Sequence, residues 1–319
     1  MVDFLATQSA RIRILDIETG ESVTVFESST LFVEAPNLSP DGRWLVVNAD
    51  GGLWRLPLAA DAGADADSRA TLERIPLGTT PPLNNDHVIS PDGRTFLVTA
   101  RDGHLYEIPF DGLADGVAPR RITSPHPTDA RFKFYLHGVS PDGAEIAAIG
   151  GGSNDAGAWV TNVYLVPVDA GSAPVGLTND DFPDDGAEFA PDGRTLWFNS
   201  ERAAAGIPGH SQVFRLSLPA PGAAAAKASA PEQITFDDRV NWFPHPSPDG
   251  RSVLYLSYPA GTLGHPANLD VELRLIDLAT GSVRNLAALF GGQGTINVPC
   301  WSPDSRRVAY VDYPLGTSA

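Results

Sequence analysis

A tetrapeptide that recurs six times constrains the fold of this 319-residue chain more than any other feature. The first copy is Ser39-Pro40-Asp41-Gly42, and the later copies begin at Ser90, Ser140, Ala190, Ser247 and Ser302, at spacings of 51, 50, 50, 57 and 55 residues. Proline sets φ for the first central position of a type I turn, Asp suits the second, and Gly accepts the left-handed conformation that closes a hairpin. Each copy therefore predicts the tip of a β-hairpin.

Short runs typical of β-strands surround each tip. The run that follows a tip, such as residues 44–47, is apolar and rich in β-branched and aromatic side chains, as expected for a buried strand. The next run, such as 53–56, alternates apolar and polar residues, and a short fourth strand, such as 121–123, leads back to the next tetrapeptide. Four antiparallel strands in about 50 residues are typical of one propeller blade.

The two ends of the chain complete one blade between them. The sixth unit stops after its second strand, residues 307–312, whereas residues 11–25 match the third and fourth strands of the fifth unit at 273–283. We therefore expect one all-β domain over residues 1–319. It is predicted to be a six-bladed β-propeller of four-stranded antiparallel blades, with the last blade closed by two N-terminal strands, which leaves few exposed edges.

Composition narrows the range of partners and locations. With 39 acidic and 22 basic residues the net charge is −17, so neither nucleic acid nor a membrane surface is expected as a partner. The single cysteine, Cys300, excludes an internal disulfide and a Cys-based zinc cluster. The first residues resemble no leader, which predicts a cytoplasmic protein, or a periplasmic or secreted one if a leader has been removed. The Ala-rich stretches at 58–70 and 219–232 are expected to be outer-rim loops.

The repeated Ser-Pro-Asp-Gly, its flanking strands and the donated closure together resemble the TolB-like β-propeller family over essentially the whole chain. More distantly, the repeat is similar to the propellers of prolyl oligopeptidase-type peptidases and of oligogalacturonate lyases. The resemblance therefore implies a fold and leaves several functions open. Because the sequence contains no Gly-x-Ser-x-Gly nucleophile elbow, an appended peptidase domain is not expected.

Polar residues just before the tetrapeptides of blades 2 to 6 mark a candidate site. In an antiparallel blade these residues lie on the face opposite the hairpin tips, and the innermost strand places them near the mouth of the central channel. Blade 1 has the small or apolar Ala35-Pro36 at this place. The predicted ligand-binding residues are Asn85, Asp86, Asp185, Asn241, Trp242, Arg202 and Asn297.

The first functional hypothesis is a channel mouth that binds a small polar ligand, most plausibly a carbohydrate. A Trp-Phe pair, Trp242-Phe243, precedes His245 and resembles a sugar-binding surface. The structural alternative is that both aromatic rings belong to the core between blades. His87 and His137 have the same offset from their tetrapeptides, so they could equally form hydrogen bonds between blades.

The second hypothesis is a carbohydrate lyase or hydrolase assisted by one divalent metal ion, such as Mn²⁺, Ca²⁺ or Zn²⁺. The segment that begins at His245-Pro246 resembles the one that oligogalacturonate lyases place near their metal. The resemblance implies that some of these side chains hold the metal ion and that a histidine removes a proton from the substrate. The predicted metal ligands are His245, His265 and Gln293, and the predicted catalytic base is His137 or His87. Glu188 is a further predicted catalytic residue, which with Asp185 could serve a hydrolase that needs no metal. The third hypothesis is a scaffold that binds a protein or peptide partner at its rim.

Overall fold

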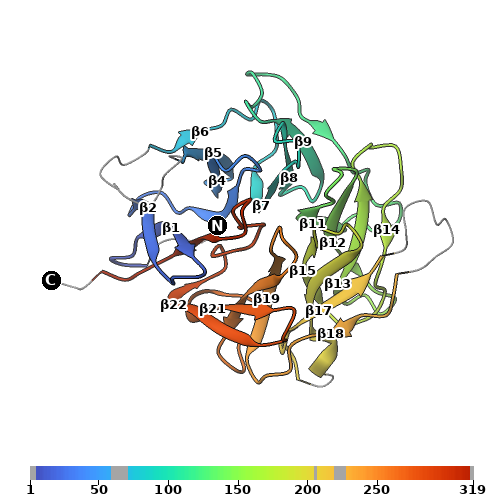
Figure 1. The fold of residues 1–319 in the computed structure, drawn as a ribbon. Coiled ribbons are helices and arrows are strands. Elements are labelled where there is room, and N and C mark those ends of the chain that lie inside the picture. The colour runs from blue at the N-terminus through green and yellow to red at the C-terminus, as the bar shows by residue number, and fades with distance from the viewer. Residues whose placement is uncertain (1–4, 59–70, 205–206, 219–227, 317–319) are drawn as a thin grey trace.

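The chain forms a ring of six blades in the computed structural model (Figure 1). The structure describes residues 5–58, 71–204, 207–218 and 228–316. Most of the two Ala-rich stretches expected as rim loops lies outside these residues. Within the described residues, no helix has the length and apolar character needed to cross a membrane.

Blades 1 to 5 are four-stranded antiparallel sheets, as the repeat predicts. Blade 1 comprises β3 (Glu34–Leu38), β4 (Trp44–Ala49), β5 (Gly52–Pro57) and β6 (Glu73–Arg74). Blade 2 comprises β7 (Leu83–Ile89), β8 (Thr95–Ala100), β9 (Leu105–Pro109) and β10 (Arg120–Arg121). Blade 3 comprises β11 (Lys133–Val139), β12 (Glu145–Ser153), β13 (Trp159–Pro167) and β14 (Val175–Gly176). Blade 4 comprises β15 (Asp184–Phe189), β16 (Thr195–Ser200), β17 (Gln212–Ser217) and β18 (Glu232–Gln233). Blade 5 comprises β19 (Val240–Pro246), β20 (Ser252–Tyr258), β21 (Ala267–Asp277) and β22 (Val283–Gly292). From blade 1 to blade 5 the first strand of each blade contacts the first strand of the next, and these strands lie around the centre of the ring.

Blade 6 joins the two ends of the chain, which confirms the predicted closure. Strand β23 (Arg307–Asp312) pairs with β1 (Ala10–Asp16), and β1 pairs with β2 (Ser22–Ser28). An ion pair between Arg11 Nη2 and Asp312 Oδ2, 2.6 Å apart, joins the two termini across this sheet. A single β-bridge, between Trp301 and Val308, joins the innermost segment of this blade to β23. Proline supplies no N–H to a ladder, and Pro299 lies in this segment.

The tetrapeptides form the predicted hairpin tips, and their polar side chains stabilise the turns. In blade 1, Ser39 Oγ donates to Asp41 Oδ1 at 2.6 Å and accepts a hydrogen bond from Trp44 N at 2.9 Å, while Gly42 has a φ of 70°. The hydrogen bond from Ser39 lowers the pKa of Asp41 to about 2. All the turn hydrogen bonds lie within six residues, so local sequence is sufficient to form this turn.

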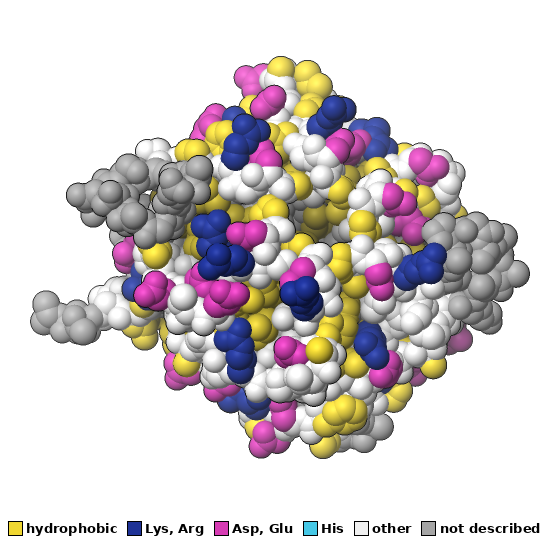
Figure 2. All heavy atoms as spheres, viewed as in Figure 1, with side chains coloured by type: hydrophobic (Ala, Val, Ile, Leu, Met, Phe, Trp, Pro, Cys, Tyr) yellow, Lys and Arg dark blue, Asp and Glu magenta, His cyan; other side chains and the backbone are white. Residues whose placement is uncertain are grey.

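Charged side chains of both signs are distributed over the surface of the ring. Figure 2 shows one face, on which basic and acidic side chains are interspersed around a central hollow. Several neighbours in sequence pair within the hairpin tips, such as Arg43 and Asp41, whose Nε and Oδ2 atoms are 2.6 Å apart. The net charge of −17 is therefore not gathered into one uninterrupted acidic patch on the face in view.

Candidate functional site at the channel mouth

A β-bulge interrupts the innermost strand of blades 1 to 5 close to the channel mouth. In blades 1, 4 and 5 the bulge contains a residue with positive φ, namely Ala35 (56°), Gly186 (63°) and Phe243 (53°), each four residues before its tetrapeptide. A bulge bends a strand and re-aims the side chains beside it. The residue that precedes this position is therefore a candidate site residue in each blade.

The fifth residue before each tetrapeptide gives one side chain per blade. These six residues, which we call the mouth ring, are Glu34, Asn85, Tyr135, Asp185, Trp242 and Asn297. Trp242 and Asn297 are buried, and the other four are half-buried. Sequence analysis selected four members of the mouth ring but missed Glu34 and Tyr135. Their constant distance from the tetrapeptide is the signal that could have identified them.

Asp185 lies between two histidines from other blades. Its Oδ1 atom is 2.8 Å from His137 Nε2, and its Oδ2 atom is 3.6 Å from His265 Nε2. Burial opposes a charge on His137, but Asp185 outweighs that effect and raises the pKa of His137 to about 9. Burial would likewise raise the pKa of Asp185, whereas His137 holds it below its usual range. At neutral pH these two residues form an ion pair at the mouth.

A loop from blade 6 completes the ring on the other side. Gln293 Oε1 contacts His265 Nδ1 and accepts a hydrogen bond from Asn297 Nδ2 at 3.2 Å. Gly294 in the same loop donates its backbone N–H to Asn297 Oδ1, and its carbonyl accepts from Ala35 N at 2.7 Å. His137 Nδ1 lies 3.2 Å from the Asn297 carbonyl oxygen. Blades 1, 3, 5 and 6 therefore meet around one polar cluster.

Two further carboxyl groups, Glu34 of the mouth ring and its neighbour Asp86, lie in blades 1 and 2. Burial raises the pKa of Glu34 to about 7, and the nearby Asp86 carboxylate raises it further. Burial also raises the pKa of Asp86 to about 6, although the charge on His137 acts in the opposite direction. Asn84 Nδ2 donates a hydrogen bond to Asp86. These two carboxyl groups can therefore exchange protons close to neutral pH, unlike ordinary surface carboxylates.

His245, which was predicted to bind a metal, is enclosed by protein groups. Its Nδ1 atom is 2.5 Å from Glu188 Oε2, and its Nε2 atom contacts the Ile296 carbonyl oxygen. Burial raises the pKa of Glu188, the other member of this pair. Because both ring nitrogens already have partners, His245 has no nitrogen left for a metal ion in this arrangement.

The three predicted metal ligands do not form one site in the structure. His265 and Gln293 contact each other, whereas His245 pairs with Glu188 and a backbone carbonyl. Over the described ranges, no group of three or more His, Cys, Asp and Glu side chains is arranged to hold a metal ion. Cys300 is fully buried, and burial raises the pKa of its thiol well above the usual value.

Two other predicted site residues, His87 and Arg202, are enclosed by protein or paired with it. His87 is fully buried, and burial lowers its pKa to about 4, so its ring is neutral at physiological pH. Arg202 donates two hydrogen bonds to Asp184, at 2.7 and 2.8 Å, and lies 3.2 Å from Asp180. These contacts hold the guanidinium of Arg202 within blade 4.

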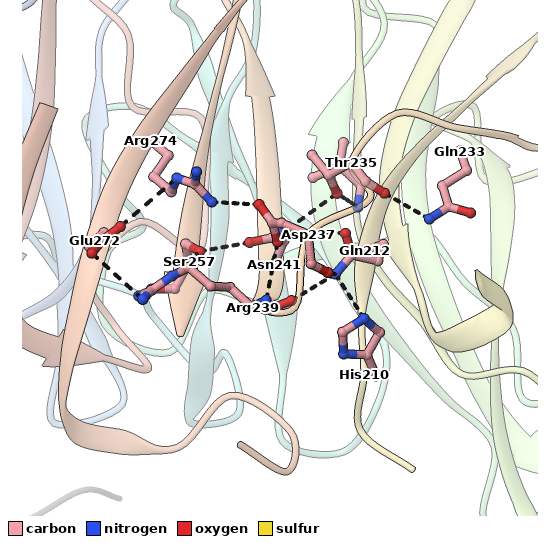
Figure 3. A network of polar contacts seen from close by, with 11 residues as sticks. His210, Gln212, Gln233, Thr235, Asp237, Arg239, Asn241, Ser257, Glu272 and Arg274 are labelled. Atoms are coloured by element: carbon pink, nitrogen blue, oxygen red, sulfur yellow. Dashed lines mark hydrogen bonds and ion pairs between the residues drawn. The ribbon is translucent and has the colours of Figure 1, made fainter. Parts of the chain in front are cut away.

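Asn241 lies in a polar network between blades 4 and 5 (Figure 3). Its Nδ2 atom donates to Thr235 Oγ1 at 3.2 Å and to Asp237 Oδ1 at 3.1 Å, and its Oδ1 atom accepts from Ser257 Oγ at 2.7 Å. The side chain is fully buried and all its donors and acceptors that face this network are occupied. Asn241 therefore joins two blades. Arg274 extends the network through Asp237.

The aromatic pair predicted as a sugar-binding surface packs in the interior. Phe243 is fully buried, and Trp242 is 6% exposed with its ring centroid 4.5 Å from that of His265. Trp242 Nε1 is buried and has no hydrogen-bond partner in the described structure. The half-buried Tyr135 is the aromatic member of the mouth ring that solvent reaches more readily.

Two proteins from Agrobacterium are similar to this chain along nearly all of its length. The uncharacterized protein Atu1656 of Agrobacterium fabrum is 37% identical over 306 residues, which cover 95% of this chain and 92% of that protein. The solved structure of an Agrobacterium tumefaciens protein provisionally named TolB is 35% identical, with a TM-score of 0.79, and the match covers 96% of this chain and 99% of that one. No protein-family model matches the sequence.

A solved oligogalacturonate lyase in complex with manganese is a more remote match. It is 13% identical with a TM-score of 0.52, and the match covers 91% of this chain and 75% of the lyase. At this identity the likeness extends to the fold alone. The metal and the activity of that lyase are not thereby transferred to this chain.

Proposed function

This chain belongs to the TolB-like β-propeller family, and from the residues at its channel mouth we propose that it binds a small ligand rich in hydroxyl groups, most simply a carbohydrate. The mouth ring is the observation that carries this proposal. It combines carboxylate, amide and phenol groups from separate blades in one half-buried cluster. Sites for small polar ligands commonly combine partial burial with a few converging polar groups.

Hydroxyl groups suit this cluster because they can both donate and accept hydrogen bonds. Asp185 and Glu34 offer acceptor oxygens, and Asn85 Nδ2 is a buried donor beside the Glu34 carboxyl group. Tyr135 adds a hydroxyl and an aromatic surface that the C–H groups of a sugar ring can contact. A ligand hydroxyl can therefore accept a hydrogen bond from Asn85 and donate one to Glu34 or Asp185.

The charges at the mouth favour neutral or cationic sugars over acidic ones. Glu34, Asp86 and Asp185 lie in or beside the mouth ring, and the charge on His137 is already paired with Asp185. A uronate carboxylate would approach these three carboxyl groups, with Arg101 as the cation whose charge reaches Glu34. We therefore place neutral sugars and amino sugars ahead of uronic acids as ligands.

Binding without turnover agrees better with the site than metal-assisted catalysis. His137 is held in an ion pair, His87 is neutral and fully buried, and Glu188 is paired with His245. Each of the three predicted catalytic groups is thus engaged by protein or enclosed by it. A lyase needs a base that reaches the substrate carbon within hydrogen-bond distance, either directly or through one water.

Isothermal titration calorimetry tests the proposal with neutral oligosaccharides, glucosamine oligomers and oligogalacturonates. We expect saturable binding of a neutral or amino sugar, weaker binding of the uronates, and no product on prolonged incubation. Tyr135→Ala and Asn85→Ala should each weaken binding, because they remove a contact surface and a donor at the mouth. Asp238→Asn, which removes an exposed carboxylate outside the mouth ring, is the matched control.

Two outcomes would contradict the proposal. The first is that no sugar in the panel binds. The second is that sugar binds equally well to the wild type and to both mouth variants, which would place the ligand elsewhere. Chelator-treated protein with and without Mn²⁺, run in parallel, detects the metal-assisted alternative, since that alternative requires binding or turnover to depend on the added ion.

A further inference from the structure

Exposed apolar side chains gather on one sector of the ring. Eleven large hydrophobic side chains are exposed among the described residues, and all three aromatic ones belong to blades 3 to 5, two in loops and Trp159 at the start of strand β13. With two aliphatic neighbours they form what we call the apolar rim: Trp159 (45% exposed), Phe182 (36%), Ile207 (60%), Phe236 (76%) and Leu263 (69%). Clustered exposed apolar groups of this kind are characteristic of interaction sites.

All five residues lie in or directly beside loops on the face opposite the hairpin tips. Trp159, Ile207 and Leu263 lie in or next to the connections between the second and third strands of blades 3, 4 and 5. Phe182 and Phe236 lie in the segments that lead into the first strands of blades 4 and 5. The blade topology places both kinds of connection on the same face as the channel mouth.

Hydrogen bonds and close packing join these loops into one surface. Asn154 Nδ2 donates to Asp181 Oδ1 at 2.8 Å, which links the Trp159 loop to the Phe182 segment. Arg202 links that segment to the Ile207 loop through Asp180, 3.2 Å away. Leu263 packs against Gly209, where an added Cβ would lie 2.8 Å from Leu263 Cδ2.

The Phe236 segment joins the same surface through Gln212. Gln212 Nε2 lies 3.3 Å from His210 Nε2 in the Ile207 loop and donates to the Asp237 carbonyl at 3.4 Å (Figure 3). The five loops are therefore held side by side, and the apolar rim is part of the folded ring.

The charges around the apolar rim identify the chemistry of its partner. Asp155, Asp181 and Asp238 are exposed in the same loops. The basic groups of this sector are mostly neutralised, since Arg202 pairs with two aspartates and Arg239 lies 3.6 Å from Glu272. Arg131, which hydrogen-bonds Ser153 at the edge of blade 3, is the exposed exception. An anionic membrane or a second copy of this acidic chain would be repelled, whereas a basic partner would be attracted.

We propose that the apolar rim is a docking surface for a polypeptide segment that carries both apolar and basic side chains. Apolar residues of the segment would cover Trp159, Phe236 and Leu263, and its lysines or arginines would lie against the exposed aspartates. Aromatic side chains commonly supply most of the binding energy of an interface, and charges at its edge govern association rate and specificity. None of the five rim residues is a member of the mouth ring, so separate variants can address the two surfaces.

Fluorescence anisotropy with a labelled amphipathic peptide of leucine and lysine tests the proposal. A peptide in which lysine is replaced by glutamate and another in which leucine is replaced by serine are the matched probes. We expect only the leucine-lysine peptide to bind, and added salt to weaken it. The double variant Phe236→Ser/Leu263→Ser should weaken binding at least about tenfold, since tenfold corresponds to about 1.4 kcal/mol and the loss of two contacts of more than about 1 kcal/mol each exceeds this.

The control variant is Val23→Ser/Val283→Ser, which removes two exposed valines from the outermost strands β2 and β22 and should bind like the wild type. Tyr135→Ala, in the mouth ring, should also leave peptide binding unchanged, so failure of the sugar proposal is distinguishable from failure of this one. Circular dichroism and the melting temperature establish that each variant is folded.

Four outcomes would overturn the proposal. In the first outcome the leucine-lysine peptide does not bind, and in the second it binds the rim variant and the wild type equally. The serine-lysine peptide binds as well, which indicates charge alone. In the fourth outcome peptide affinity is unchanged in the rim variant but another interaction is lost. Loss of binding to phosphatidylcholine vesicles would identify a membrane as the occupant, and loss of concentration-dependent dimerisation in sedimentation would identify a second copy.

Discussion

The ion pair between His137 and Asp185 should make the stability of this protein depend on pH in a defined window. The pKa of His137 is raised from 6.5 to about 9 in the folded protein. A group whose folded pKa is raised stabilises the fold fully below its unfolded pKa, and this contribution is lost as pH rises through the folded pKa. His137 should therefore stabilise the protein below about pH 6.5 and lose that effect by about pH 9.

The size of the effect follows from the shift. A change of one pKa unit corresponds to about 1.4 kcal/mol, so the rise of His137 from 6.5 to about 9 corresponds to about 3 kcal/mol. Asp185→Asn removes the carboxylate that raises this pKa and keeps the shape of the side chain. We expect the variant to be less stable than the wild type by up to about 3 kcal/mol at pH 6.5 and by much less at pH 9.5.

Urea unfolding followed by tryptophan fluorescence at several pH values between 6 and 9.5 measures this difference. Glu34 also titrates at the lower end of this range, but it does so in both proteins and cancels from the comparison. Asp238→Asn is the control, and its difference from the wild type should not change with pH. A constant difference between Asp185→Asn and the wild type across the whole range would refute the reasoning, because the ion pair would then contribute nothing that depends on protonation.

Three further predictions address the turns, the closure and the mouth, each checked by the free energy of unfolding. Gly93→Ala should cost about 1 kcal/mol, because φ is 70° with open space around the site, whereas Gly186→Ala should cost several times more, because its Cβ would lie 3.0 Å from Phe243 Cα; equal losses would contradict this. Ile12→Ala, at a fully buried position of the closing strand β1, should cost about 2–5 kcal/mol, and a loss below about 0.5 kcal/mol would mean that closure is not needed. Glu34→Gln should stabilise the protein by about 1–2 kcal/mol at pH 8 but not at pH 4.5. Burial raises the pKa of Glu34 from 4.5 to about 7, so ionisation of this carboxyl group at pH 8 destabilises the fold. A gain in stability at both pH values would contradict this cause.

The fold could be predicted from the sequence because its signals are local and repeated. The turn at Ser39 depends on hydrogen bonds to Asp41 and Trp44, all within six residues. Such contacts form whatever the rest of the chain does, so the tetrapeptide marks hairpin tips directly. Closure was predictable for a related reason. The sequence of strand β1 repeats the pattern of β21, and the C-terminal repeat unit ends before the third strand that β1 supplies.

The site was predictable only in part. The repeat places one residue per blade at a constant distance from the tip, which is why Asn85, Asp185, Trp242 and Asn297 could be assigned to the mouth from sequence. The same rule applied to blade 1 would have included Glu34. Burial could not be inferred in this way, and Trp242, expected at a binding surface, packs in the interior against His265.

The sequence by itself determined the number of blades, the positions of the hairpin tips and the way the ring closes. Only the tertiary structure decided the partners: Glu188 with His245, 57 residues away, and His137 with Asn297, 160 residues away. These contacts exist because closure of the ring brings separate blades to one axis. Protonation and exposure at the mouth depend on which groups become neighbours there and on how much water they exclude, and no local pattern encodes either quantity.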